Sequence, residues 1–175
     1  MHHIHHTEGI ILGSRNFGEA GKCYYILTRD LGMIYASAQG VRKMSSKLRY
    51  ILHDFAYVKI DLVQGKDFWR ITTGSKTSEL EDLTQKLEIL AIFAKIAGLL
   101  RRLLTGVEKN EPLFTGLLDG LSLLQGAKSS NELKSIETNI VLLILDKLGY
   151  VESTRIKDRA EAINIINQAL KQSHL

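Results

Sequence analysis

The segment from Thr7 to Gly74 carries short apolar or alternating stretches separated by glycine and charged residues, a pattern typical of β-strands. The pattern predicts five strands, at Glu8–Leu12, Lys22–Thr28, Met33–Gln39, Phe55–Val63 and Phe68–Thr73. The second and third strands form a hairpin across Asp30-Leu31-Gly32, where glycine can take a positive φ. The fourth and fifth form another hairpin across 64–67, and Ser45 to Leu52 adds a short helical turn between the two.

The fourth predicted strand shows how these strands divide between core and solvent. Ala56, Val58, Ile60 and Leu62 share one face, whereas Tyr57, Lys59 and Asp61 share the other. Five antiparallel strands, each with one buried and one solvated face, favour a small closed barrel. Three strands, a connector and two further strands is the layout of an OB-type barrel.

After Gly74 the apolar residues recur every three or four positions, which predicts helices. The first helix starts at the capping-box pair Ser78 and Glu81 and runs to about Leu104. The second runs from Pro112 to Gly126. A third follows a second capping box, Ser129 with Glu132, and is closed by Gly149, and a fourth lies within 158–172. The predicted fold class is α+β, with a five-stranded OB-fold barrel at 1–76 and an α-helical bundle domain at 77–175.

The charge of the chain is unevenly distributed between these two parts. Residues 1–78 hold 11 Lys and Arg against 6 Asp and Glu, a net charge of +5. The remaining residues hold 12 against 13, a net charge of −1, which together give the formal +4 of the whole chain. This asymmetry predicts a basic binding module joined to a nearly neutral body.

The densest basic run lies in the connector between the two hairpins, where positions 42 to 49 contain no acidic residue. Its cations are Arg42, Lys43, Lys47 and Arg49. Lys and Arg displace condensed counterions from a phosphate backbone, so such a run predicts nucleic-acid binding, with a plain solvated loop as the alternative. Further basic residues near strand ends or on wet faces extend the predicted track: Arg15, Lys22, Arg29 and Arg70.

Aromatic side chains are the second expected component of a single-strand site, because every base can stack on a ring. The candidates are Tyr24, Tyr25, Tyr35, Tyr50, Tyr57, Phe68 and Trp69. Strand alternation directs about half of them inward. Tyr35 and Trp69 are selected as base-contacting residues, and core packing is the alternative for each.

Several other classes of protein find little support in the sequence. It contains no phosphate loop, no paired histidine ligands on a helix and no nucleophile elbow, so neither an enzyme nor a cofactor is predicted. The lone Cys23 cannot form an internal disulfide and is expected at a buried strand position. No apolar run is long enough to span a membrane, and a cytoplasmic location is expected. The histidine pairs at positions 2–3 and 5–6 fit a metal-binding tail, a disturbed purification tag or a frayed end, and no metal role is assigned to them.

A set of short segments in the first half of the chain is distinctive. They are Thr7-Glu8-Gly9-Ile10-Ile11-Leu12, Gly18-Glu19-Ala20, Leu27-Thr28, Gly32 and Ala38-Gln39-Gly40-Val41-Arg42-Lys43. These segments resemble the N-terminal OB domain of bacterial DNA repair proteins of the RecO family. The resemblance continues into the helical part, at Leu113-Phe114, Leu117-Leu118 and Leu148-Gly149-Tyr150.

This resemblance implies a non-enzymatic, nucleoid-associated recombination mediator. Such a protein binds single- and double-stranded DNA, anneals complementary strands, contacts the C-terminal tail of the single-strand binding protein SSB, and works with RecR to load RecA. In that family the helical domain captures the SSB tail. Arg101 and Arg102 are the candidates to pair with a tail carboxylate, and a solvated bend in a core helix is the alternative.

The chain departs from the family pattern in one respect. Many members carry a four-cysteine zinc module after the third helix, but Val151 to Lys157 contains no cysteine, so no zinc is expected there. Two other classes stay open beside the mediator. One is an RNA-binding OB protein that uses the same basic run, and the other is an interaction scaffold whose partner binds residues 79–175.

Overall fold

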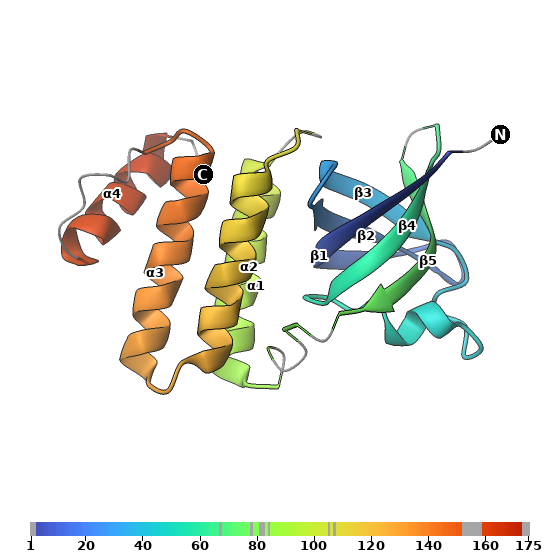
Figure 1. Ribbon diagram of the computed structural model, residues 1–175, viewed down its shortest axis with the longest axis horizontal. Coiled ribbons are helices and arrows are strands. Elements are labelled where there is room, and N and C mark those ends of the chain that lie inside the picture. The colour runs from blue at the N-terminus through green and yellow to red at the C-terminus, as the bar shows by residue number, and fades with distance from the viewer. Residues whose placement is uncertain are drawn as a thin grey trace. The chain divides into compact units, whose positions relative to one another are not determined.

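The chain forms two compact units, seen in a computed structural model (Figure 1). The structure describes residues 3–66, 68–77, 79–80, 83, 85–104, 106, 108–151 and 159–172. The barrel unit comprises Met1–Glu81 together with Ala97–Glu111, and the helical unit comprises Asp82–Ile96 together with Pro112–Leu175. The chain therefore passes between the units more than once, and a domain boundary between residues 76 and 77 stays a prediction.

The strands of the barrel unit close in the order β1-β2-β3-β5-β4. They are β1 (Ile4–Phe17), β2 (Gly21–Thr28), β3 (Gly32–Ala38), β4 (Tyr57–Gln64) and β5 (Trp69–Lys76), with a short 3-10 helix η1 (Lys47–Tyr50) between β3 and β4. The predicted α+β fold, a five-stranded OB-fold barrel followed by helices, is confirmed. β1 is longer than predicted because its first half pairs with β4 and its second half pairs with β2.

The expectation that all strands are antiparallel is wrong for one pair. β3 and β5 are parallel, with Ala36 beside Trp69 and Ser37 beside Arg70. The reason is geometric: β2 and β4 both run antiparallel to β1, so β3 and β5, which reverse direction once more, must run the same way. Closing the barrel brings these two strands together.

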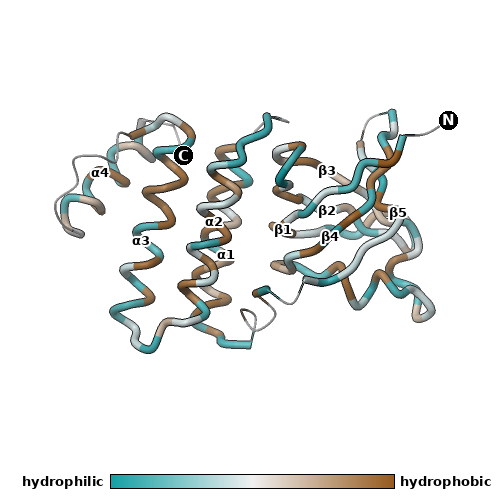
Figure 2. Tube along the Cα trace, viewed as in Figure 1, coloured by the Kyte–Doolittle hydropathy of each residue, from teal (hydrophilic) through white to brown (hydrophobic). Residues whose placement is uncertain are grey.

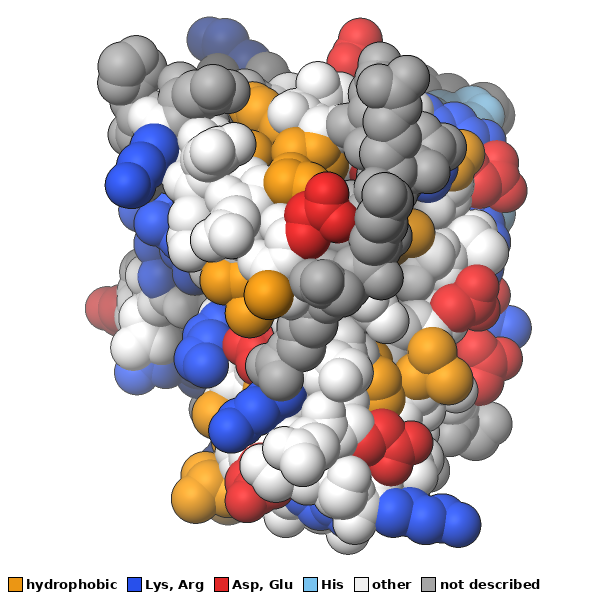
Figure 3. Space-filling view, turned by 90° about the vertical axis from the view of Figure 1, so that its left-hand side faces the viewer, with side chains coloured by type: hydrophobic (Ala, Val, Ile, Leu, Met, Phe, Trp, Pro, Cys, Tyr) orange, Lys and Arg blue, Asp and Glu red, His pale blue; other side chains and the backbone are white. Residues whose placement is uncertain are grey.

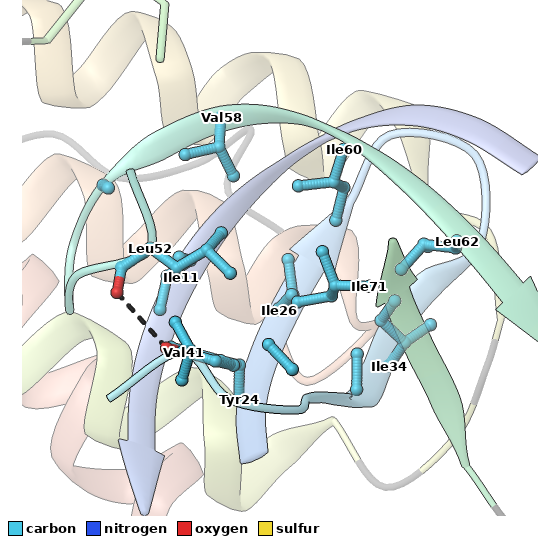
Figure 4. Packing of buried hydrophobic residues seen from close by; sticks show 13 residues of the cluster. Ile11, Tyr24, Ile26, Ile34, Val41, Leu52, Val58, Ile60, Leu62 and Ile71 are labelled. Carbon is cyan, nitrogen blue, oxygen red and sulfur yellow. Dashed lines mark hydrogen bonds between the residues drawn. The ribbon is translucent and has the colours of Figure 1, made fainter. Parts of the chain in front are cut away.

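The barrel interior is filled by inward-facing side chains from all five strands and from the connector (Figure 4). They include Ile11, Tyr24, Ile26, Ile34, Val41, Leu52, Val58, Ile60, Leu62 and Ile71. On the other face of β2, Cys23 is also buried, with 1% of its surface exposed, which confirms that it occupies a buried strand position. At 25 cal/mol per Å² of buried apolar area, such a core is the main source of barrel stability.

The helical unit is built from α1 (Leu87–Leu103), α2 (Glu111–Gly126), α3 (Ser130–Lys147) and α4 (Arg159–Gln172). The predicted cap of α3 is confirmed, because the Ser129 hydroxyl accepts a hydrogen bond from the Glu132 amide at 3.2 Å. The capping box predicted for the first helix, at Ser78 and Glu81, lies outside the described residues. Figure 2 shows hydrophobic and hydrophilic stretches alternating along α3, as an amphipathic helix requires.

Close packing of α2 on α3 depends on small residues. A Cβ at Gly120 would lie 2.6 Å from Ile140, and one at Gly116 would lie 2.8 Å from Leu143. Within the described residues, no helix has both the length and the apolar character that a membrane span needs.

Candidate nucleic-acid interface

The connector between β3 and β4 is a tightly turned segment whose apolar residues anchor it to the barrel. Along it, the Lys43 amide donates to the Gly40 carbonyl and the Ser46 amide to the Lys43 carbonyl, both at 3.0 Å. Val41 and Leu52, near its two ends, are buried in the barrel core. Residues 40–52, called the cationic connector below, therefore hold their charged side chains on a fixed backbone.

The four predicted cations of the connector are all exposed. Arg42 ties the connector to the β1–β2 turn: its amide donates to the Ala20 carbonyl at 2.9 Å and its guanidinium to the Glu19 carbonyl at 3.3 Å. The Arg49 guanidinium contacts the Met44 sulfur. Among the described residues, none of the four forms an ion pair with an acid, so their charge is available to an anion from outside.

A groove of about 230 Å³ runs between the connector and the start of β2. Its lining consists of Lys22, Tyr24, Val41, Arg42, Arg49 and Leu52. The fold thus brings Lys22 together with Arg42 and Arg49, which lie 20 or more positions further along the chain. Lys43 and Lys47 belong to the same connector but do not line this groove.

Tyr24 forms the floor of the groove and does not serve as a platform for bases. Its ring is fully buried, and its hydroxyl donates to the Leu52 carbonyl at 3.3 Å (Figure 4). Burial raises the pKa of Tyr24 to about 12, so the hydroxyl stays protonated at neutral pH. Tyr50, by contrast, is 64% exposed on the connector.

A second surface, rich in aromatic rings, lies on the outer side of β2 and β3. The rings of Tyr25 and Tyr35 are 5.0 Å apart between centroids, Phe68 lies 6.4 Å from Tyr35, and Phe17 lies 5.9 Å from Phe68. This aromatic face borders a pocket of about 420 Å³ whose lining includes Tyr25, Tyr35, Lys66, Phe68, Trp69 and Leu104. In OB folds the face of strands 2 and 3, with the loops after strands 1 and 4, binds oligonucleotides.

Two arginines cover the tyrosines of the aromatic face. Arg15 donates from Nε to the Tyr35 hydroxyl, and its Cζ lies 5.0 Å from the centre of that ring. The hydrogen bond to Tyr35 raises the pKa of Arg15 above its usual value. Arg101, near the end of α1, places its Cζ 4.2 Å from the centre of the Tyr25 ring. Arg101 and the barrel strands belong to the same compact unit.

Three residues complete this face. Trp69 is half-buried against the core, lines the pocket, and packs edge-on to the His5 ring at 5.0 Å. Arg70, the next residue on β5, is exposed beside Ser37 of β3. Phe17 is 44% exposed and is not among the aromatic candidates selected from the sequence, because the first predicted strand ends at Leu12. The sequence signal for it was an aromatic residue directly before Gly18.

Arg29 lies in a different environment from the other predicted contacts. Its guanidinium donates to Glu8 Oε2 at 2.9 and 3.0 Å, and the Tyr57 hydroxyl donates to the same oxygen at 2.7 Å. Lys59 adds a longer ion pair to Glu8 at 3.7 Å. The hydrogen bonds from Tyr57 and Arg29 lower the pKa of Glu8 below its usual 4.5. The Glu8 carboxylate therefore already neutralises the positive charge of Arg29.

The remaining candidates concern partners and metals. Arg102 is exposed one residue after Arg101. Figure 3 shows one face of the molecule, on which basic, acidic and hydrophobic side chains are mixed. No group of three or more metal-ligating side chains occurs among the described residues; His6, for instance, pairs with Asp61 at 2.5 Å. Of the segment where a zinc module was considered, Val151 to Lys157, all residues after Val151 fall outside the described part of the chain.

Comparisons with known proteins agree with this barrel. The family model for the N-terminal domain of recombination protein O matches residues 1–78. A DNA repair protein RecO from Pelotomaculum thermopropionicum is 29% identical over 147 residues, covering 84% of this chain and 56% of that protein. One from Roseiflexus sp. is 32% identical over 148 residues, covering 84% of this chain and 50% of that protein.

A third relative, the DNA repair protein RecO of Heliobacterium modesticaldum, is 28% identical over 147 residues, covering 84% of this chain and 52% of that protein. The chain thus spans about half the length of the curated relatives it matches. The resemblance noted in the sequence is confirmed, and it reaches beyond the barrel into the helical unit.

Proposed function

We propose that this chain acts in DNA repair as a non-enzymatic recombination mediator, because residues 1–78 match the family model for the N-terminal domain of recombination protein O. It binds single- and double-stranded DNA through the barrel unit and anneals complementary strands. The comparisons support a role in DNA repair and recombination, because the relatives are named DNA repair protein RecO and the family model describes recombination protein O. That this chain itself binds DNA and anneals strands is what we propose.

The observation that carries the proposal is the convergence of Lys22, Arg42 and Arg49 on one groove, with no acid paired to any of them among the described residues. Neutralising a phosphate with Lys or Arg releases condensed counterions, which makes binding favourable and dependent on salt. Lys43 and Lys47 extend the charge along the connector. Arg15, Lys22 and Arg70 are the proposed contacts on the strands.

Annealing requires strands that are held by their backbones while the base edges stay free to pair. A groove of cations on a fixed connector meets the first requirement, because it contacts phosphates without reading bases. Tyr35 and Trp69 are the proposed base contacts, and both line the pocket on the aromatic face. The two surfaces border the β1–β2 turn, to which Arg42 is hydrogen-bonded.

The proposed partners are the SSB tail, RecR and, through RecR, RecA, in a cytoplasmic and nucleoid-associated setting. Arg101 and Arg102 are the proposed contacts for the acidic tail of SSB. This part of the proposal rests on the similarity to RecO proteins, of which the chain spans about half. No cofactor is proposed.

A strand-annealing assay on SSB-coated oligonucleotides tests the proposal. Changing Arg42, Lys43, Lys47 and Arg49 to Ala is expected to weaken single-strand binding at moderate salt at least tenfold and to slow annealing. With a slope of about 0.7 per phosphate contact on single strands, the salt dependence of log K decreases by about 3.

The matched control removes the same charge from the helical unit, by changing the exposed residues Lys86, Lys128, Lys134 and Lys171 to Ala. It is expected to bind DNA as the unchanged protein does. Unchanged binding and slope in the connector variant would overturn the proposal. Competition between DNA and RNA strands of equal length tests the RNA-binding alternative, because RNA preference requires a contact to the 2′-hydroxyl.

A further inference from the structure

Arg15 and Arg101 each place a guanidinium over one of two neighbouring tyrosine rings. Their Cζ atoms lie 5.0 Å above the Tyr35 ring and 4.2 Å above the Tyr25 ring, and those two rings are 5.0 Å apart. A strand and a helix that are far apart in sequence therefore deliver two positive charges to one patch of the barrel. The inference drawn from this pair rests on the proposed function.

The backbone of β1 makes room for Arg101. Gly13 lies at a register shift in the pairing of β1 with β2 and has a φ of 151°. A Cβ at this position would lie 3.0 Å from Arg101 Nη1, closer than side chains normally allow. A glycine at the bulge thus permits the guanidinium to lie against the sheet above Tyr25.

The two charges are not compensated by acids. Within the described part of the chain, neither Arg15 nor Arg101 forms an ion pair, and both residues are exposed. Stacking on a ring uses the face of a guanidinium and leaves N–H groups at its edge to donate. Two guanidiniums that lie over neighbouring rings, with no acid paired to either among the described residues, leave a net positive charge that favours an anion at this patch.

We propose that Arg15 and Arg101 together bind a backbone phosphate of single-stranded DNA whose unpaired base enters the adjacent pocket. The pocket borders both tyrosines and also presents Phe68, Trp69 and Lys66. Tyr25 and Tyr35 then support the guanidiniums, so this inference replaces the base-contacting role proposed above for Tyr35. The stacking partners for the base are Phe68 and Trp69.

Arg101 and Arg102 are thereby separated in role. Arg101 is stacked on the barrel face, whereas Arg102, the next residue of α1, has no ring contact among those found in the described residues. We assign Arg101 to the DNA surface, which replaces the contact with the SSB tail proposed above for this residue. Arg102 is left as the arginine available to an acidic partner.

Fluorescence anisotropy with a labelled oligothymidine tests the assignment through matched variants of the full chain. Arg101→Gln is expected to weaken binding about five- to tenfold and to lower the salt slope by about 0.7, the value for one phosphate contact. Arg102→Gln removes the same charge one residue away and is expected to change the affinity less than about twofold.

Changing the supporting ring gives an independent readout. Tyr25→Leu should reproduce the loss seen in Arg101→Gln, whereas Tyr25→Phe, which keeps the ring, should bind like the unchanged protein. Thermal unfolding of each variant identifies loss of binding that comes from loss of folding. If Tyr25→Leu unfolds, the pair Arg101→Gln and Arg102→Gln still decides the question.

Equal affinities for Arg101→Gln and Arg102→Gln would overturn the inference. So would a variant Arg101→Gln that binds DNA normally but loses binding to an acidic peptide. The proposed function fails separately: if the cationic connector variant binds as well as the unchanged protein, the connector is not the DNA site. Loss of binding in the connector variant with none in Arg101→Gln leaves the proposed function intact and removes this inference alone.

Discussion

Two clusters of positive charge on the same barrel differ in what neutralises them. In the cationic connector, Arg42 and Arg49 border a groove with no acidic residue in its lining. In the second cluster, Arg29 and Lys59 surround Glu8, which accepts from Arg29 at 2.9 and 3.0 Å and also from Tyr57. The first cluster is open to an external anion, whereas the second is largely satisfied internally.

The difference shows that a count of basic residues does not locate a binding surface. Arg29 was included in the predicted DNA track because of its charge, but the acid that holds it lies 21 residues earlier in the chain. The groove beside Glu8 also contains Asp30 and Asp61. Its mixed charge makes a continuous contact with phosphates unfavourable there.

The largest expected effect comes from loosening the connector. Leu52 is 2% exposed and anchors the connector to the core. Leu52→Ala removes buried methyl groups and is expected to lower the free energy of unfolding by about 2–5 kcal/mol, measured by urea titration. Met44→Ala, at a connector position that is 78% exposed, serves as the control and should change it by less than about 0.5 kcal/mol. Equal effects would mean that the connector is not anchored through Leu52.

A smaller effect is expected in the satisfied cluster, and it depends on pH. Hydrogen bonds from Tyr57 and Arg29 lower the pKa of Glu8 below 4.5, so its ionised form favours the folded state. That stabilisation is present above pH 4.5 and is lost as the pH falls through the lowered pKa. Glu8→Gln is therefore expected to lower the free energy of unfolding by about 1–2 kcal/mol at pH 7. Below the lowered pKa of Glu8 it is expected to change that free energy very little.

Unfolding free energies measured from pH 7 downward check this prediction. Asp61 retains part of the acid dependence in both proteins, because hydrogen bonds from His6 and Thr73 lower its pKa too. A constant difference between the unchanged protein and Glu8→Gln at every pH would contradict the role given to Glu8.

Much of the barrel could be predicted because local patterns determine it. Alternation located the strands, and Gly32 with its φ of 67° marked the hairpin turn. The parallel contact of β3 with β5 could not be predicted in this way, since it arises only when the sheet closes. The full length of β1 was also missed, because the histidines at its start interrupt the alternation of apolar residues.

The candidate site was predicted less completely than the fold. The basic run at Arg42 to Arg49 was visible as a segment without acids, but its approach to Lys22 depends on the hydrogen bonds from Arg42 to the β1–β2 turn. The contact of Arg101 with Tyr25 joins residues 76 positions apart and depends on the bulge at Gly13. Neither leaves a periodic signal in the sequence.

The most direct test of the account compares two variants that lose equal charge from the two clusters. One carries Arg42→Gln and Arg49→Gln, and the other carries Arg29→Gln and Lys59→Gln. Single-strand binding is measured across a salt series, below the unfolding temperature of both. The variant with Arg42→Gln and Arg49→Gln is expected to bind about tenfold more weakly, and its salt slope is expected to fall by about 1.4. The variant with Arg29→Gln and Lys59→Gln is expected to keep the affinity and salt slope of the unchanged protein. Equal losses in the two variants would contradict the account, because net charge alone would then explain binding.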